Sequence, residues 1–353
     1  MLNLRGDVAR LAGQVVDIES VSGAEDALAD EVWVALGEYG HLNLFRLGNN
    51  IVARTELGRP QRVIVAGHLD TVPVAGNLPG EVRLIRGREA LFGRGACDMK
   101  GGLAVQLSLA ASVVEPARDV TWIFYDNEEA EPDKSGMGRL IAERPDLVAA
   151  DVGILMEPTN AVIEAGCEGT MRVAVRASGV AAHSARWWLG ENAIHDLAGP
   201  LALLAWFRAD EVRVDGLVFR EGLNAVAISG GVAGNVIPDR AELVVNYRFS
   251  PDKSVDQAEQ YVRGVFEDCD VVVTDSAPGA RPDLTDPLLA GLVDALGGTV
   301  KPKYGWTDVA RLAQLGIPAV HFGPGDPNVA HKDEEYVFLD QVLQCREALG
   351  NWL

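Results

Sequence analysis

The chain has 353 residues, 48% of them hydrophobic, which excludes a disordered protein and allows two domains of about 150 residues each. Its 51 acidic residues against 31 basic ones give a formal net charge of -20, and such a surface repels phosphate backbones, so we expect no nucleic acid partner. No apolar run reaches the roughly 18 residues of a membrane span, and the N-terminal residues have no signal-peptide core. We therefore expect no membrane partner and a cytoplasmic protein.

The four cysteines are widely spaced and form no Cys-x-x-Cys pair; they are Cys97, Cys167, Cys269 and Cys345. This spacing predicts free thiols in a reducing compartment rather than a disulfide framework or a zinc-binding cluster of thiolates.

The first part of the chain alternates helical patterns with apolar runs. Apolar residues at helical spacing predict helices over 7–19 and 24–38, the second opening on a capping box of Ser22 and Glu25. Short strands are expected near 42–46 and 50–55, and a buried helix over 103–113. The continuous apolar runs 63–68, 120–125 and 152–156 are typical of buried strands in a parallel sheet.

From about residue 171 the pattern changes to alternating strands with one wet face. Strands are predicted over 171–177, 224–229, 242–249 and 270–274, with helices over 192–208 and 254–266. This β-α-β-β-α-β order is that of a ferredoxin-like sandwich. We therefore predict an α/β chain: a catalytic domain of residues 1–171 and 283–353, with a mixed, largely parallel sheet flanked by helices, and an inserted ferredoxin-like dimerisation or lid domain of residues 172–282. The second catalytic segment is expected to form helices over 286–296, 308–315 and 339–352 and a strand over 317–322.

Chemically useful side chains follow the three apolar runs where each run ends. His68 and Asp70 follow the first, Glu128 and Glu129 the second, and Glu157 the third. Because ligands bind outside the carboxyl ends of strands in open α/β sheets, these ends are expected to meet at one site. His-x-Asp alone is equally compatible with two solvated residues, but Asp70 can also orient a ligating His68.

A glycine-rich turn over residues 93–102 surrounds Asp98, which suggests backbone in unusual conformations or in close approach to another group. The rival interpretation is a phosphate-binding loop. The turn lacks both the Gly-Lys-Ser/Thr ending and the G-x-G-x-x-G spacing, which argues against that interpretation.

Nitrogen and oxygen donors without thiolate make up the candidate ligand set: His68, Asp98, Glu129, Glu157 and His331. Such a set suits zinc, cobalt or manganese, and it exceeds the needs of one tetrahedral zinc. It fits two ions about 3.5–4 Å apart with a bridging carboxylate, for which Asp98 is the candidate. Since Glu128 and Glu129 are adjacent, one is expected to bind metal while Glu128 acts as general base and then protonates the leaving nitrogen. A Glu-Glu pair by itself is more typical of a solvated helix start.

These motifs together resemble the co-catalytic zinc aminoacylase/carboxypeptidase family. The resemblance is carried by residues 67–73, 93–102, 127–129 and 156–158 and by the late His331, and it covers nearly the whole chain. It implies two zinc ions per subunit, replaceable by cobalt or manganese, with His68, Asp98 and Glu157 on one ion and Asp98, Glu129 and His331 on the other. It also implies Glu128 as general base and Asp70 as the carboxylate behind His68.

The resemblance further implies a homodimer formed through the inserted domain. His183 would then reach across the dimer and donate to the oxyanion formed during amide hydrolysis, although His183 alone could be an ordinary loop residue. Arg186, Asn235 and Arg248 are candidates to bind substrate carboxylates, with surface ion pairing as the alternative for the arginines.

Within the family, residues 164–170, 183–195 and 305–310 are similar to enzymes that hydrolyse N-succinyl amides of amino acids. The expected partner is thus a small acylated amino acid. Acetylornithine deacetylation, other acylamino-acid or dipeptide hydrolysis, and a non-catalytic metal-binding scaffold remain the alternatives. The chain departs from many relatives at Cys167-Glu168, where they carry two arginines.

Overall fold

The computed structural model describes residues 2–353, which divide into two compact units. The first unit holds the residues up to Ala165 together with Asp283–Lys301 and Arg311–Leu353. The second holds Gly166–Pro282 and Pro302–Ala310. Compared with the predicted insertion of residues 172–282, the second unit starts six residues earlier, at Gly166, and also includes Pro302–Ala310.

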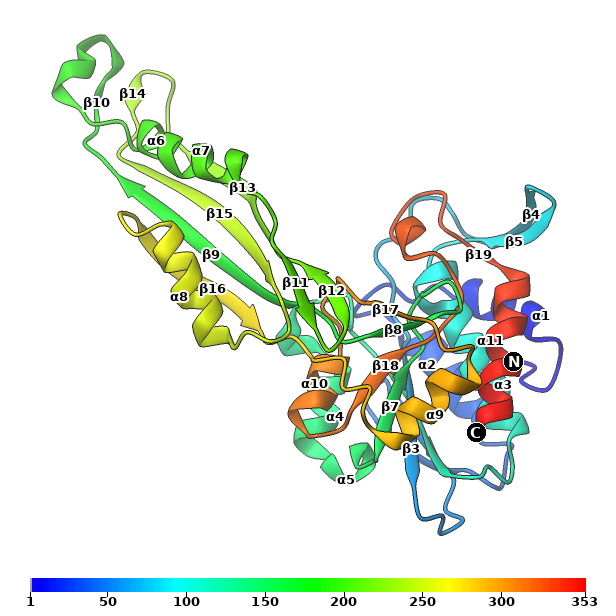
Figure 1. Ribbon diagram of the computed structural model, residues 1–353. Helices are drawn as coiled ribbons and strands as arrows, with labels where there is room; N and C mark the ends of the chain where they lie inside the picture. Colours follow the sequence, from blue (N-terminus) through cyan, green and yellow to red (C-terminus); the bar gives the residue numbers. More distant parts are fainter. Residues whose placement is uncertain (1) are drawn as a thin grey trace. The chain divides into compact units, whose positions relative to one another are not determined.

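An eight-stranded sheet forms the centre of the first unit (Figure 1), in the spatial order β1-β2-β6-β3-β7-β18-β8-β17. Its strands are β1 (Asn43–Leu47), β2 (Asn50–Arg54), β3 (Arg62–His68), β6 (Asp119–Tyr125), β7 (Val152–Leu155), β8 (Ile163–Ala165), β17 (Val300–Pro302) and β18 (Ala319–His321). The four inner strands β6, β3, β7 and β18 are parallel, whereas β2 and β8 pair antiparallel on either side of them. The predicted mixed, largely parallel sheet is confirmed.

Helices cover this sheet, and α3 (Gly101–Ser112) is the most deeply placed. All residues from Gly101 to Ala111 are buried, as expected for a helix that is apolar on every side. The other helices of the unit are α1 (Val8–Val16), α2 (Asp26–Leu36), α4 (Gly136–Glu143), α5 (Pro145–Val148), α9 (Pro287–Ala295) and α11 (Leu339–Trp352). The helix α10 spans Val309–Gln314.

A small antiparallel sheet of β4 (Glu81–Ile85), β5 (Arg88–Phe92) and β19 (Tyr336–Phe338) was not predicted from the sequence. Its order is β19-β5-β4, so it joins a segment near residue 90 to one near residue 337. This pairing fixes the starting point of the glycine-rich turn relative to the loop that carries His331.

The second unit is built on a four-stranded antiparallel sheet in the order β13-β15-β9-β16. Its strands are β9 (Gly169–Ser178), β13 (Gly222–Gly230), β15 (Arg240–Phe249) and β16 (Asp270–Ala277), and its helices are α6 (Ala193–Asp196), α7 (Ala198–Trp206) and α8 (Val255–Val265). When the four strands are numbered along the chain, their order across the sheet is 2-3-1-4. Helices connect the first strand to the second and the third to the fourth. This is the predicted ferredoxin-like arrangement. Two short ribbons complete it: β10 (Ala182–His183) with β14 (Val236–Ile237), and β11 (Glu211–Val214) with β12 (Leu217–Arg220).

Two local predictions were wrong. The helix predicted over 192–208 is divided into α6 and α7, because Pro200 has no N–H to donate to the carbonyl of Asp196. The capping box is also absent: α2 begins after Glu25, which makes no side-chain cap, and Ser22 donates to Asp70 instead.

Candidate active site

The carboxyl edge of the central sheet in the first unit gathers the predicted strand-end residues. His68 is the last residue of β3, Asp126 to Glu129 follow β6, and Glu157 follows β7. These three strands are adjacent and parallel, so their ends lie at one edge. His68 is 1% exposed and Asp70 is 0% exposed, so they are not the two solvated residues of the alternative interpretation.

Asp98 reaches this edge from the glycine-rich turn between β5 and α3. The turn spans Ala96–Lys100 and is entered through Gly95 at a φ of 77°; it is kinked at Asp98 and Met99, whose backbone angles are not helical. A Cβ at Gly95 would lie 2.5 Å from Cγ2 of Thr71, so a side chain there would collide with the segment that follows His68. The absence of a side chain at Gly95 thus permits the close approach of the Thr71 side chain.

The carboxylate of Asp98 lies between two imidazole rings. Its Oδ1 is 3.2 Å from Nε2 of His68, and its Oδ2 is 3.4 Å from Nε2 of His331. Nε2 of His331 is also 2.6 Å from Oε1 of Glu129. Ligand atoms of His68, Asp98 and Glu129 all lie within 4.8 Å of one another.

The charges of this cluster shift its pKa values strongly. Burial lowers the pKa of His68, but its contacts with Asp70 and Asp98 outweigh burial and hold that pKa well above its usual value. Hydrogen bonds to Asp98 and Glu129 raise the pKa of His331 to about 10. Burial opposes ionisation of Asp98, yet the two histidines hold its pKa well below the usual range. Without a metal, protons on the imidazoles therefore balance the carboxylates.

The donor set fits divalent metal ions. Imidazole nitrogens and carboxylate oxygens converge without a thiolate, and one carboxylate offers an oxygen to each side, which suits a pair of ions such as zinc, cobalt or manganese. The negative charge of Glu157 adds a smaller contribution, after those of Asp70 and Asp98, to the raised pKa of His68.

Asp70 lies behind His68, but its carboxylate has a second set of contacts. Nδ1 of His68 is 2.9 Å from the backbone carbonyl of Asp70 and 3.6 Å from its Oδ1, so the ring donates mainly to the carbonyl. The carboxylate oxygens instead accept the backbone N–H groups of Glu128 and Glu129, both at 2.9 Å. Asp70 therefore holds the turn that carries the expected general base and a metal ligand.

Ser22 and Glu25 support the same turn, which the sequence did not reveal. The Ser22 hydroxyl donates to Oδ2 of Asp70 at 2.7 Å, and Oε1 of Glu25 accepts the backbone N–H of Asn127 at 3.3 Å. Asn127 has a φ of 54°, a left-handed conformation that directs the chain away from β6. The pattern Ser-x-x-Glu is the only local signal for this role, and it equally fits a helix cap.

The remaining predicted residues lie in the second unit. His183 is exposed at the end of β10, and its Nδ1 accepts the backbone N–H of Ala185 at 3.1 Å, which leaves the proton on Nε2 in the neutral ring. The carbonyl of Asn235 accepts the N–H of Ser184, so the candidate residues Asn235 and His183 lie on neighbouring backbone segments. Arg186 is exposed, whereas burial lowers the pKa of Arg248 against the opposing charge of Glu168.

Cys167 and Glu168, the expected departure from the family pattern, are both buried. Burial raises the pKa of the Cys167 thiol to about 11 and that of Glu168 to about 7. Oε1 of Glu168 accepts the backbone N–H of Arg220, so this carboxyl has a place in the packing of its own unit.

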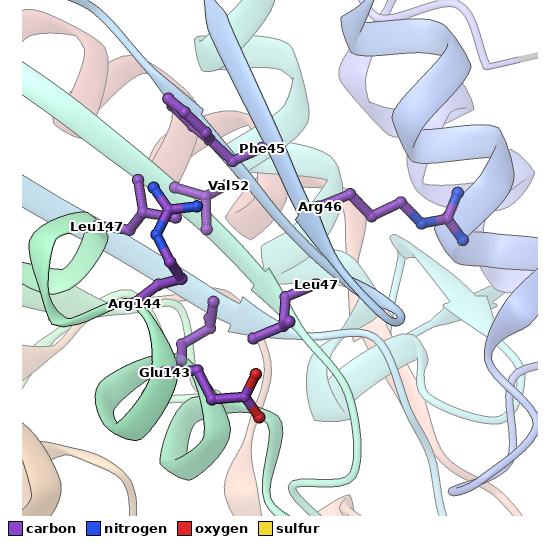
Figure 2. Close-up of a pocket in the computed structure, with 8 residues that line it drawn as sticks. Phe45, Arg46, Leu47, Val52, Glu143, Arg144 and Leu147 are labelled. Carbon is purple, nitrogen blue, oxygen red and sulfur yellow. The ribbon is translucent and has the colours of Figure 1, made fainter.

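A pocket elsewhere in the first unit contains none of these residues. It lies between the β1–β2 hairpin and the α4–α5 segment, where Phe45, Val52 and Leu147 surround Arg144 (Figure 2). The Arg144 guanidinium lies 5.4 Å from the Phe45 ring centre and pairs with Asp146, while Arg46 points away and pairs with Asp30. Its arginines already have acidic partners on the protein.

Residues 64–353 match the model of peptidase family M20/M25/M40. The chain belongs to this family, which confirms the predicted resemblance, and it is a metal-dependent amide hydrolase. It is 52% identical over 356 residues to a Mycobacterium tuberculosis protein provisionally named succinyl-diaminopimelate desuccinylase, covering 100% of this chain and 99% of the relative. It is 43% identical over 363 residues to the succinyl-diaminopimelate desuccinylase of Corynebacterium glutamicum, covering 100% and 97%.

Two solved structures have the same fold at low sequence identity. A tripeptidase of Staphylococcus aureus superposes with a TM-score of 0.78 at 18% identity, covering 100% of this chain and 98% of that one. A dinuclear metal-binding M20 peptidase of Bacillus subtilis superposes with a TM-score of 0.72 at 14% identity, covering 99% and 97%. Among residues 2–353, no helix has the length and apolar character needed to cross a membrane.

We predict that Asp70→Asn lowers metal affinity by about 10–100-fold, because an amide nitrogen would face one of the two N–H groups that the carboxylate now accepts. Ser22→Ala removes one contact of Asp70 and keeps both of those hydrogen bonds, so its effect should be smaller. Competition with a chelator measures the metal affinity of both variants. Wild-type affinity in Asp70→Asn would show that the turn is held by other contacts.

We also predict that metal uptake releases protons. A histidine must be neutral to bind metal, and the pKa of His331 is raised to about 10, so at about pH 7.5 its proton must leave. Metal affinity should therefore rise with pH until the pH approaches 10. Calorimetric titration in two buffers of different ionisation enthalpy measures the release, and His331→Gln should release fewer protons. A binding heat that is independent of the buffer would contradict this.

Proposed function

We propose that the protein hydrolyses N-succinyl-LL-2,6-diaminopimelate to succinate and LL-2,6-diaminopimelate, a step of lysine biosynthesis. The observation that carries the proposal is the Asp98 carboxylate between two imidazoles, beside a turn that presents Glu128 and Glu129. The choice of substrate is supported by the full-length similarity to the Corynebacterium glutamicum desuccinylase.

The metal site would use the five donors predicted from the sequence. Asp98 would bridge two ions, His68 and Glu157 would complete one site, and Glu129 and His331 would complete the other, with zinc as the proposed metal. Bound divalent ions would polarise the amide carbonyl and lower the pKa of water to about 7.

Glu128 is the proposed general base. It takes a proton from the attacking water as the new C–O bond forms, and it delivers that proton to the amide nitrogen as the C–N bond breaks. Succinate then leaves with the added oxygen and the amine leaves with the proton, so one water is consumed. Asp70 supports this role by fixing the backbone N–H of Glu128.

His183 is the proposed oxyanion donor. Because its Nδ1 accepts the N–H of Ala185, the neutral ring keeps its proton on Nε2, where it can be donated to an oxygen. Arg186, Asn235 and Arg248 are the proposed contacts for the substrate carboxylates. Arg248 is the partly buried one of the two arginines, and burial strengthens a charge-assisted hydrogen bond.

A homodimer through the second unit is part of the proposal. The strand β13 is an edge of its sheet and is exposed along most of its length, with Val226 at 56% and Ile228 at 54% exposed. Beside it, the almost wholly apolar α7 exposes Leu203 and Trp206. An exposed apolar edge strand is a template for pairing with another chain, and a second copy would cover strand and helix together.

The cytoplasm is the proposed compartment. Cys97, Cys167, Cys269 and Cys345 all have free thiols, which fits a reducing environment.

Glu128→Gln should retain both metals and lose most of its turnover of succinyl-diaminopimelate, because the amide cannot accept the proton from water. The exposed Glu131→Gln is the control in the same segment and should keep its activity. Metal content and steady-state rates on succinyl-diaminopimelate, acetylornithine and a dipeptide decide the matter. Loss of metal in Glu128→Gln would make that residue a ligand, and a preference for acetylornithine would favour the activity of a Myxococcus xanthus relative with 28% identity over 311 residues.

His183→Ala should lower kcat by about 10²-fold. If His183 serves the neighbouring subunit, mixing His183→Ala with Glu128→Gln should restore about a quarter of wild-type activity, because half of randomly paired dimers are mixed and each holds one intact site. No recovery in mixed dimers would place His183 in its own subunit's site. A monomer in sedimentation would rule out the exchange altogether.

A further inference from the structure

We infer that the buried Arg94–Glu335 ion pair positions Asp98 for metal binding. This inference rests on the proposed function, because it takes Asp98 as a metal ligand. Arg94 and Glu335 touch none of the reacting groups, so they would act through the backbone of the turn that carries Asp98.

The Glu335 carboxylate holds this turn by its backbone. Glu335 is 1% exposed, and its Oε1 accepts the N–H groups of both Cys97 and Asp98 at 3.0 Å. Burial raises the pKa of Glu335, and the backbone N–H groups of Asp98 and Gly95 oppose that shift by favouring the charged form. Successive N–H groups that converge on one carboxylate form an anion-binding nest, here filled by a side chain of the same protein.

Arg94 connects the nest to two other segments of the site. Its Nη1 is 2.9 Å from Oε2 of Glu335 and donates to the carbonyl of Lys332 at 3.2 Å, and its Nε donates to the carbonyl of Pro73 at 2.9 Å. Pro73 follows the His68–Asp70 segment and Lys332 follows His331. The ion pair therefore joins the three segments that bring Asp98 together with its two histidines.

A buried ion pair is seldom the most stable filling for an interior, since desolvation of two charges offsets their attraction. At this position the ion pair also fixes the orientation of its partners. The planar Arg94 guanidinium donates to two carbonyls and to the Glu335 carboxylate. That carboxylate in turn accepts the N–H groups of Cys97 and Asp98. The N–H groups of Cys97 and Asp98 fix where the Asp98 side chain begins. Its two oxygens can then face His68 on one side and His331 on the other.

The test is Glu335→Gln, which keeps the shape and loses the charge. Its amide nitrogen must face either Arg94 or the two backbone N–H groups, so one set of contacts is broken. We expect metal affinity to fall by about 10–100-fold, the visible spectrum of the cobalt-loaded protein to change, and kcat to fall more than KM.

Asp119→Asn is the matched control. Asp119 is also buried in the first unit, accepts two backbone N–H groups from Leu57 and Arg59, and lies 3.7 Å from Arg62, but at the opposite edge of the sheet. It should lower thermal stability without changing metal affinity or the cobalt spectrum. An equal loss of affinity in both variants would reduce Glu335 to a general stabilising residue and overturn the inference.

Arg94→Lys covers the case in which Glu335→Gln does not fold. Lysine keeps the charge opposite Glu335 but cannot reach both carbonyls, so it should weaken metal binding and alter the cobalt spectrum. Wild-type affinity and spectrum in the folded variants would overturn the inference. Asp98→Asn distinguishes failure of the proposed function from failure of the positioning role. If this variant binds two metals as tightly as the wild type, the proposed function fails. If it loses metal but the Glu335 and Arg94 variants do not, only the positioning role fails.

Discussion

The contact on which this structure depends is a single carboxylate, that of Asp98, placed between the imidazoles of His68 and His331. Its partners come from the end of a central strand and from a loop more than 200 residues further along the chain, which the structure must bring within a few ångströms. Parallel strands bring one histidine and Glu157 to the edge of the sheet. The small sheet of β4, β5 and β19 and the ion pair of Arg94 with Glu335 then hold the other segments against that edge.

The same principle recurs on each side of Asp98. Carboxylates with no expected contact to substrate hold backbone N–H groups: Asp70 holds the Glu128–Glu129 turn, and Glu335 holds the Cys97–Asp98 turn. A turn held by its backbone leaves its side chains available for chemistry. The proposed general base Glu128 and the proposed ligands Glu129 and Asp98 therefore lie in turns whose backbone is held by buried acids.

The sequence predicted those features of this arrangement that depend on short, continuous stretches of the chain. Apolar runs predict strands, parallel strands share an edge, and residues such as His68 and Glu157 could be placed there before the fold was known. Contacts between distant segments were missed. Ser22 has the spacing of a helix cap, but its hydroxyl donates to Asp70 instead. Glu335 ends a run of charged residues that is typical of a solvated surface. Its neighbour Glu334 is indeed 79% exposed, whereas Glu335 is buried. No local pattern distinguishes those two glutamates, because the difference arises from the partner that folding brings to one of them.

The position of His331 beyond the second unit has a consequence for synthesis on the ribosome. A nascent chain that has completed β7 already contains His68, Asp98 and Glu129, but it lacks His331 and the Arg94 partner Glu335. The second unit must be made before either residue emerges. The last of the proposed metal ligands therefore becomes available only after the whole second unit has been synthesised, although it belongs to the first unit.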